Sequence, residues 1–390
     1  MIEQSRPTPV LEIDALIDSP RTEVVVTCGS GGVGKTTAAA AIALRAAERG
    51  RCVVVLTIDP ARRLAQSLGL DELSNEPHEV LGIKGTGRLF AMMLDMKRTF
   101  DDVVTAHSTP ERAQQIFANP FYQSLSSSFA GTQEYMAMEK LSQLRESMQT
   151  DRAHAPWDLI VVDTPPSRSA LDFLDAPNRL GRFLDGRMIR LLSTPARAGG
   201  RAYVKVISAS FSLFTRVLTK ILGSELLSDV ASFVSALETM FGGFRERAEQ
   251  TYQLLKADGT AFLVVAAPEP DALREASFFV ERLSAEGMPL GGLILNRLHE
   301  APAPLSGRAA EAALERLEAG PEDAPLAAAA LRVHVVSSDA AAADTRMARR
   351  FAAAHPSVAT ARVAALPADV HDLAGLRTVG TLLAKRPKSA

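Results

Sequence analysis

A glycine-rich loop that follows a short apolar run constrains the fold of this chain more than any other feature. Residues 22–37 read TEVVVTCGSGGVGKTT, in which the run leads directly into the pattern G-x-x-x-x-G-K-[ST]. The fixed positions of that pattern are filled by Gly29, Gly34, Lys35 and Thr36. In such a loop, successive backbone N–H groups converge on phosphate oxygens at a helix N-terminus. The loop therefore predicts a nucleoside triphosphate site between a strand and a helix.

Each residue of this loop has an expected part in binding. Lys35 supplies positive charge to the β- and γ-phosphates, and the Thr36 hydroxyl is the expected Mg²⁺ ligand. The remaining predicted nucleotide contacts in the loop are Gly29, Gly31, Gly32, Val33, Gly34 and Thr37. Ser30 departs from the version of the loop in which this position carries an additional lysine.

The rest of the chain alternates short β-branched runs with helical stretches, which is the pattern of a parallel α/β sheet. Because most of the runs are apolar without alternation, we expect strands that are buried on both faces. The expected strands are 22–28, 52–59, 158–166, 260–270 and 290–298, with LRVHVVSS (331–338) and ARVAALPAD (361–369) as later pieces of the same sheet. The predicted fold is a mostly parallel, doubly wound sheet of the P-loop NTPase type with a helical insertion.

The predicted domain organisation has three parts. Residues 1–20 form an N-terminal extension, 21–179 and 257–390 form the ATPase core, and 180–256 form a helical subdomain. Within the core, residues 100–150 also indicate helices, and residues 301–330 indicate a surface connection with a short helix. In the subdomain, apolar residues recur every three or four positions over 204–221 and 227–244. These stripes fit either helices that pack on each other or a groove for a hydrophobic client.

Composition argues against several other classes of protein. The formal net charge of −2 gives no support for nucleic acid as the main partner. Cys28 and Cys52 are the only cysteines and form no C-x-x-C pair, so we expect neither a cysteine zinc site nor a disulfide framework. The N-terminus lacks the features of a signal peptide, and no run reaches about 18 uncharged apolar residues. We expect a cytoplasmic protein that reaches a membrane only through a partner.

Three polar residues stand at the ends of expected strands, where ligands bind in parallel sheets. Asp163 has the position of a Walker-B-type aspartate, which contacts magnesium directly or through water. The same position also suits a residue that caps a helix. Asp59 can orient the attacking water, or cap the helix that starts at the Asp-Pro step, or do both. Asn296 can pair with adenine through its side-chain amide or simply end the strand at a turn.

Four segments in order make the chain resemble a known family. GSGGVGKTT (29–37), TIDPARRLAQSLG (57–69), IVVDTPPS (160–167) and ILNRL (294–298) are similar to the arsenite-pump and tail-anchored-protein-targeting ATPases. This family belongs to the deviant Walker A class. The likeness covers about residues 25–300, and VAALPADVHDLAGL (363–376) is similar to the family's closing segment.

The resemblance implies an ATP-operated, Mg²⁺-dependent dimer in which two nucleotides face each other across the interface. It implies that Asp59 lies in switch I and positions water, and that Asp163 lies in switch II near magnesium. It implies that Asn296 contacts adenine and that Pro367 lies in the loop that flanks the base. It also implies that residues 180–256 correspond to the client groove of the targeting members, opened and closed by the nucleotide cycle.

Departures from the family pattern are equally informative. The usual switch II sequence D-T-A-P-T-G-H is altered here, with Arg168 in place of glycine and Ser169 in place of histidine. The family's C-x-x-C zinc site is absent, so we expect ATP and Mg²⁺ but no zinc. Two cysteines cannot supply the metalloid site of the arsenite members, so arsenite transport is not expected.

Ser30 is the largest departure, because the missing lysine would reach across the dimer to the partner's nucleotide. Loss of such a trans cation can cost on the order of 10³–10⁵ in rate, by analogy with arginine fingers. Two outcomes follow: a slow or differently activated homodimer, or a heterodimer with a lysine-bearing paralogue, which we prefer as a hypothesis. A regulatory subunit with little hydrolysis, or a partition-type ATPase that organises DNA or a membrane surface, remains the alternative.

Overall fold

The computed structural model describes residues 9–59, 63–106, 108–119, 122–123, 132–149, 155–165, 249–319 and 324–385. The chain divides into two compact units, one comprising 1–93, 145–171 and 254–390 and the other comprising 94–144 and 172–253. Residues 94–144, which the sequence pattern places in the ATPase core, belong to the second unit in the structure. The predicted apolar helices at 204–221 and 227–244 lie outside the described residues.

The first unit is built on a sheet that, in the described part of the chain, has eight strands. All neighbouring strands are parallel except the pair β3–β4. In spatial order the strands are β3 (His78–Glu79), β4 (Arg88–Met93), β2 (Cys52–Thr57), β5 (Leu159–Asp163), β1 (Val24–Cys28), β6 (Thr260–Ala266), β7 (Leu290–Leu298) and β8 (Thr360–Ala364). Every residue of β1, β5 and β6 is buried, as their unbroken apolar runs predict. The predicted α/β class is confirmed.

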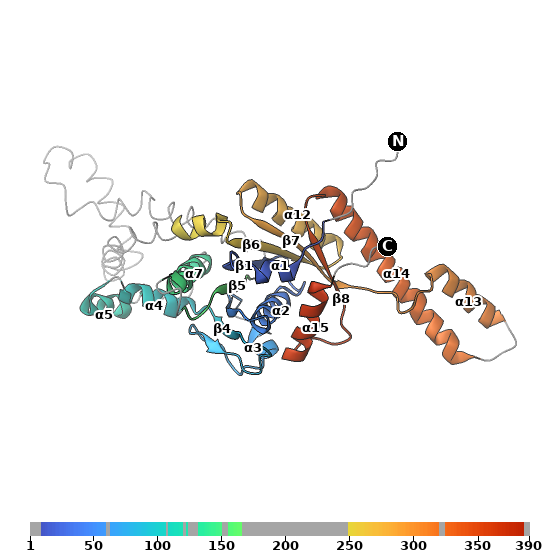
Figure 1. Cartoon of the computed structure of the whole chain (residues 1–390), viewed down its shortest axis with the longest axis horizontal. Helices are drawn as coiled ribbons and strands as arrows, with labels where there is room; N and C mark the ends of the chain where they lie inside the picture. The colour runs from blue at the N-terminus through green and yellow to red at the C-terminus, as the bar shows by residue number, and fades with distance from the viewer. Residues whose placement is uncertain are drawn as a thin grey trace, which may run out of the picture. The chain divides into compact units, whose positions relative to one another are not determined.

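Helices cover both faces of this sheet (Figure 1). On one face α2 (Lys35–Glu48) packs beneath β1, β2 and β5, with α3 (Arg63–Leu68) and α15 (Leu373–Ala384) beside it. The seven alanines of α2 favour the helix and allow it to approach the strands closely, and most of its residues are buried. α12 (Pro270–Ala285) lies on the other face against β6 and β7.

Residues 11–18, which fall within the predicted N-terminal extension 1–20, pack into the core. Helix α1 (Ile13–Asp18) packs on α2, and Ile13 and Ile17 are fully buried. Two ion pairs hold α1 in place, because Arg45 Nε contacts Asp14 Oδ1 at 2.5 Å and Arg49 pairs with Asp18. The sequence pattern of α1 is too short to reveal this packing.

The predicted strand LRVHVVSS (331–338) was wrong. These residues lie inside α14 (Pro325–Ala354), which forms a helical hairpin with α13 (Gly307–Ala319) (Figure 1). Alanine-rich sequence on both sides of the segment favours the helix, and this overrides the β-preference of three valines. Val333 and Val336 are 62% and 69% exposed, so the apolar run is not a buried strand.

Among the described helices, α14 alone is long and apolar enough to cross a membrane by length and composition, and 11% of its most apolar window is buried. Helices of water-soluble proteins meet the same criterion. Its C-terminal half carries several charged residues, and part of the helix packs on α12 and β7.

The second unit is helical in its described residues, as predicted for 100–150. It contains α4 (Met96–Ala106), α5 (Pro110–Ala118) and most of α7 (Thr132–Gln149). Tyr122 donates a hydrogen bond to Asp101 of α4, and its ring packs edge-on against Phe100. Strands β3 and β4 were not predicted, because β3 has two residues and β4 is a six-residue strand that directly follows the glycine-rich segment 82–87.

The Asp14–Arg45 pair generates a pH-dependent prediction. The hydrogen bond from Arg45 lowers the pKa of Asp14 from its ordinary value of 3.8. A carboxyl group with a lowered folded-state pKa stabilises the fold above its unfolded pKa and loses that contribution as pH falls through the folded value. We therefore expect Asp14→Asn to lower the free energy of unfolding by about 0.5–1 kcal/mol at pH 7, since the pair is partly exposed. Urea denaturation should detect almost no difference at about pH 2; an equal loss at both pH values would contradict this account.

Candidate nucleotide site

The ends of three parallel strands bring the predicted phosphate site together. Strands β1 and β2 both pair with β5, so that Thr27 and Thr57 lie in register with Asp163 on either side. All three residues are buried at the carboxyl edge of the sheet, where the loop between β1 and α2 begins. Strand register thus explains how residues more than 100 positions apart meet at one place.

Close contacts require glycine at two positions of the loop, one facing a backbone oxygen and the other a side-chain amide. Gly29 has φ +147°, and a Cβ there would lie 2.1 Å from the carbonyl oxygen of Val265. Gly34 has φ +92°, and a Cβ there would lie 2.3 Å from Asn296 Nδ2. That amide nitrogen donates a 2.8 Å hydrogen bond to the carbonyl oxygen of Val33. Asn296 therefore fastens the end of β7 to the loop just before α2 begins at Lys35.

Lys35, the first residue of α2, is 5% exposed. Its Nζ donates a 2.7 Å hydrogen bond to the carbonyl oxygen of Ser30. Burial lowers the pKa of Lys35, while the negative charges of Asp163 and Asp59 act in the opposite direction. The Ser30 Oγ is itself buried and has no hydrogen-bond partner among the described residues. The loop region thus contains a buried cation, Lys35, and a buried hydroxyl without a hydrogen-bond partner in the described chain, Ser30.

Asp163 is fully buried at the end of β5. Its Oδ2 accepts a 3.0 Å hydrogen bond from Thr57 Oγ1, and its Oδ1 has no hydrogen-bond partner in the described chain. Burial raises the pKa of Asp163 to about 6, although the hydroxyls of Thr36 and Thr57 and the charge of Lys35 act to lower it. A buried carboxylate oxygen without a partner is energetically costly and suits a hard cation such as Mg²⁺.

The donor set fits magnesium bound together with a nucleotide. Thr36 and Asp163, the two predicted ligands, are neighbours in the structure. Among the described residues no group of three or more His, Cys, Asp or Glu side chains is arranged to hold a metal. Mg²⁺ usually takes one or two protein ligands and completes its shell with phosphates and water. The predicted absence of zinc stays a prediction.

Asp59 stands two residues after the end of β2 and is half-buried. Its backbone N–H donates a 3.2 Å hydrogen bond to Thr57 Oγ1, the hydroxyl that also binds Asp163. Its charge reaches both Lys35 and Asp163. Its predicted part in positioning water stays a prediction, and residues 60–62, like Arg168 and Ser169, lie outside the described chain.

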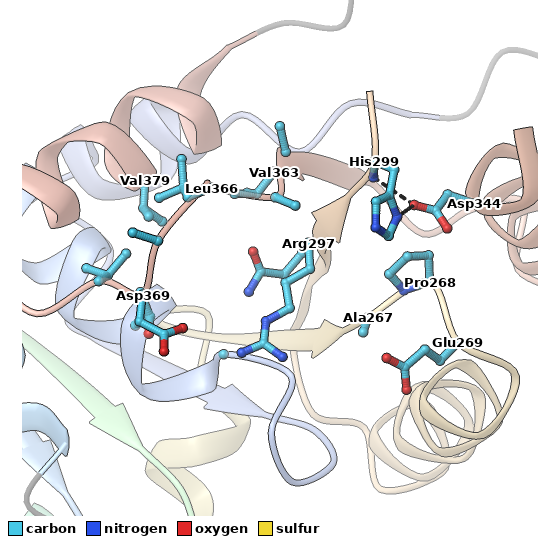
Figure 2. Close-up of a pocket in the computed structure, with 17 residues that line it drawn as sticks. Ala267, Pro268, Glu269, Arg297, His299, Asp344, Val363, Leu366, Asp369 and Val379 are labelled. Atoms are coloured by element: carbon cyan, nitrogen blue, oxygen red, sulfur yellow. Dashed lines mark hydrogen bonds and ion pairs between the residues drawn. The ribbon is translucent and has the colours of Figure 1, made fainter. Parts of the chain in front are cut away.

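A cavity of about 450 Å³ adjoins the loop on its β7 side (Figure 2). Gly34, Thr37 and Asn296 line it. The loop after β8 contributes Leu366 and Ala368, whereas Pro367 between them is exposed and is not part of the lining. The contacts predicted for Asn296 and Pro367 with the base stay predictions.

Three residues that were not predicted as site residues also line the cavity. Arg297 extends into it from β7, and His299 and Asp344 form part of its wall (Figure 2). Asp344 Oδ2 accepts hydrogen bonds from the backbone N–H of His299 at 2.7 Å and lies 2.9 Å from its Nδ1. Arg297 directly follows the predicted Asn296, and this proximity is the one sequence signal that points to it. Asp344 lies 45 residues from its partner, and no local pattern marks it.

A comparison with known protein families matches the part of the chain that carries this site. Residues 22–305 match the model of a family described as anion-transporting ATPase, a span that includes the glycine-rich loop, Asp59, Asp163 and Asn296. The chain belongs to the anion-transporting ATPase family. The predictions of this family and of ATPases as a class are therefore confirmed.

Curated relatives of this family member are similar over most of its length. ATPase GET3C of Arabidopsis thaliana is 26% identical over 284 residues, which cover 69% of this chain and 65% of the relative. ATPase GET3 of Podospora anserina is 23% identical over 288 residues, covering 73% and 76%. The ATPase ASNA1 homolog of Cryptosporidium parvum is 26% identical over 270 residues, covering 69% and 63%. The match thus spans slightly less than two thirds of the first and third of these relatives.

The contact between Gly34 and Asn296 predicts different costs for two alanine substitutions. Gly32→Ala introduces a Cβ at φ +78° with nothing within 4 Å, so only backbone strain of about 1–2 kcal/mol is expected. Gly34→Ala has comparable strain and also drives a Cβ into the Asn296 amide, which should cost about 1–3 kcal/mol more. Urea denaturation of the nucleotide-free protein measures both. Equal losses for the two variants would show that the amide does not hold this position.

Proposed function

We propose that this chain binds ATP with Mg²⁺ and hydrolyses it. The observation that carries the proposal is the meeting of Lys35, Thr36 and Asp163 at the carboxyl edge of the sheet, with one carboxylate oxygen of Asp163 buried and unpartnered. A cation bound with a nucleotide would satisfy that oxygen. The adjoining cavity between the loop and β7 has room for the base.

Each residue has a separate chemical part in this proposal. Magnesium, when bound, neutralises charge on the phosphate oxygens during transfer. Thr36 and Asp163 hold it, the latter directly or through water. Lys35 exchanges the Ser30 carbonyl for phosphate oxygens, and the backbone N–H groups of the loop accommodate the rest of the phosphate charge. Asp59, close to these charges, orients the attacking water.

The test is phosphate release from ATP in the presence of Mg²⁺, including a single-turnover measurement. Lys35→Ala should lower the rate by about 100-fold or more, because a preorganised charge on the transferred group is lost. Lys84→Ala is the matched control, since this lysine is exposed and remote in sequence from the loop. Equal rates for the two variants would overturn the proposal. Tight ATP binding without any turnover would favour a regulatory nucleotide-binding subunit instead.

We further propose that the active form is a dimer in which a lysine-bearing paralogue completes the site of this chain. Ser30 carries no charge, and its buried hydroxyl cannot replace a cation that acts across an interface. In a heterodimer, the nucleotide of this chain would receive the partner's lysine, while the partner's nucleotide would face Ser30. A homodimer of this chain would lack both lysines and hydrolyse ATP slowly.

Restoring the lysine within this chain tests that idea. Ser30→Lys should raise the turnover of the chain on its own by about 10-fold or more, because the trans cation returns. Ser30→Gln is the control, as it adds length without charge. Addition of a paralogue with the lysine should produce a comparable increase for the wild-type chain. If neither the substitution nor the paralogue changes turnover, the heterodimer proposal fails while the ATPase proposal stands.

The physiological part of the proposal is a cytoplasmic cycle in which ATP-driven closing and opening of the dimer acts on a hydrophobic client or a membrane-protein partner. Its support is the resemblance to tail-anchored-protein-targeting ATPases and the two apolar stripes at 204–221 and 227–244. Nucleic acid is not expected as a partner, because the chain has a formal net charge of −2.

A further inference from the structure

The backbone at the end of β7 has an unfavourable conformation that needs an explanation. Arg297 has φ +59°, and it is the one non-glycine residue with positive φ in the described chain. A left-handed backbone conformation is unfavourable for any residue that has a Cβ. The long, unbranched side chain of arginine makes no local interaction in the described chain that would offset this cost. Such residues cluster at functional sites, where surrounding structure holds them in place.

An irregularity in strand pairing accompanies this conformation. The register between β7 and β8 shifts between Leu295 and Leu298, the interval that contains Asn296 and Arg297. In a regular strand, two successive side chains point to opposite faces of the sheet. Irregularities of this kind redirect side chains near functional sites. Here Asn296 and Arg297 both line the same cavity.

Interactions within the protein do not account for this placement. Arg297 is exposed and makes no hydrogen bond or ion pair with any other described residue. Two carboxylates, Glu269 and Asp369, line the same cavity, yet neither forms an ion pair with it. Figure 2 shows the guanidinium extended into the cavity rather than folded back on the surface. The strained backbone therefore directs a guanidinium toward whatever occupies the cavity.

We propose that Arg297 is a specificity-determining residue that stacks its guanidinium on the base of the bound nucleotide. The proposal rests on the proposed function, namely that this cavity receives the base of ATP. A planar guanidinium stacks favourably on aromatic faces. The apolar residues Val363, Leu366 and Val379 form another part of the cavity wall, so the base lies between an apolar surface and a cation. A purine offers a larger face than a pyrimidine, and Arg297 thus favours purine nucleotides.

Calorimetric titration of the full-length protein with three ligands tests this inference. ATP carries a purine, CTP carries a pyrimidine, and inorganic tripolyphosphate carries no base. Arg297→Gln should raise the Kd for ATP by about 5- to 20-fold, as expected for loss of a stacked cation. The Kd for tripolyphosphate should change by less than about twofold, because it cannot stack. The preference for ATP over CTP should fall in the same variant.

Arg297→Gly provides the matched control for folding. Glycine adopts positive φ without strain, so this variant keeps the backbone conformation while it removes the guanidinium. It should unfold at no lower urea concentration than the wild-type protein and should lose ATP affinity as Arg297→Gln does.

Three results would overturn the inference. Unchanged ATP affinity in both variants would show that Arg297 does not contact the base. Equal losses for ATP and tripolyphosphate would assign Arg297 to the phosphates instead. A wild-type protein that binds no ATP would overturn both this inference and the proposed function, whereas the first two results leave the proposed function intact.

Discussion

The hydrogen bond from the Thr57 hydroxyl to the fully buried carboxylate of Asp163 is the interaction around which the phosphate site is arranged. It joins the ends of β2 and β5, and Lys35 lies close enough for its charge to act on the same carboxylate. Burial raises the pKa of Asp163 to about 6, because the ionised carboxylate loses its contact with water. Keeping this carboxylate charged near neutral pH therefore costs free energy. The unpartnered Oδ1 is the part of this arrangement that the protein alone does not satisfy. A cation bound with the nucleotide would satisfy it.

A second contact connects this proposed phosphate site to the adjoining cavity. Asn296 donates to the carbonyl oxygen of Val33, and Gly34 leaves the space that the amide occupies. The position of β7 is therefore coupled to the position of the loop. Just after the end of β7, His299 is bound by the buried Asp344 of α14. The short segment from Asn296 to His299 thus connects the loop, the cavity and the helical hairpin.

The sequence could predict much of this arrangement, and the reasons are physical. Unbroken apolar runs such as VVVTC and LIVVD are typical of strands buried on both faces, and Asp163 stands at the end of such a run. The features that could not be predicted from short sequence patterns depend either on contacts between distant residues or on the sequence that flanks the pattern. LRVHVVSS has the composition of a strand, but the surrounding alanines place it in α14. Asp344 and the left-handed conformation of Arg297 have no local sequence signal, because pairing across the fold determines both.

The central claim is that Asp163 holds magnesium beside a nucleotide bound in the glycine-rich loop. Its most direct test is the Kd for ATP, measured by calorimetry with and without Mg²⁺, for the wild-type protein and for Asp163→Asn, which has nearly the same shape. We predict that Mg²⁺ strengthens ATP binding to the wild-type protein by about 10-fold or more, and that the substitution removes most of this effect. An identical effect of Mg²⁺ in both proteins, or no ATP binding to the wild-type protein, would contradict the claim.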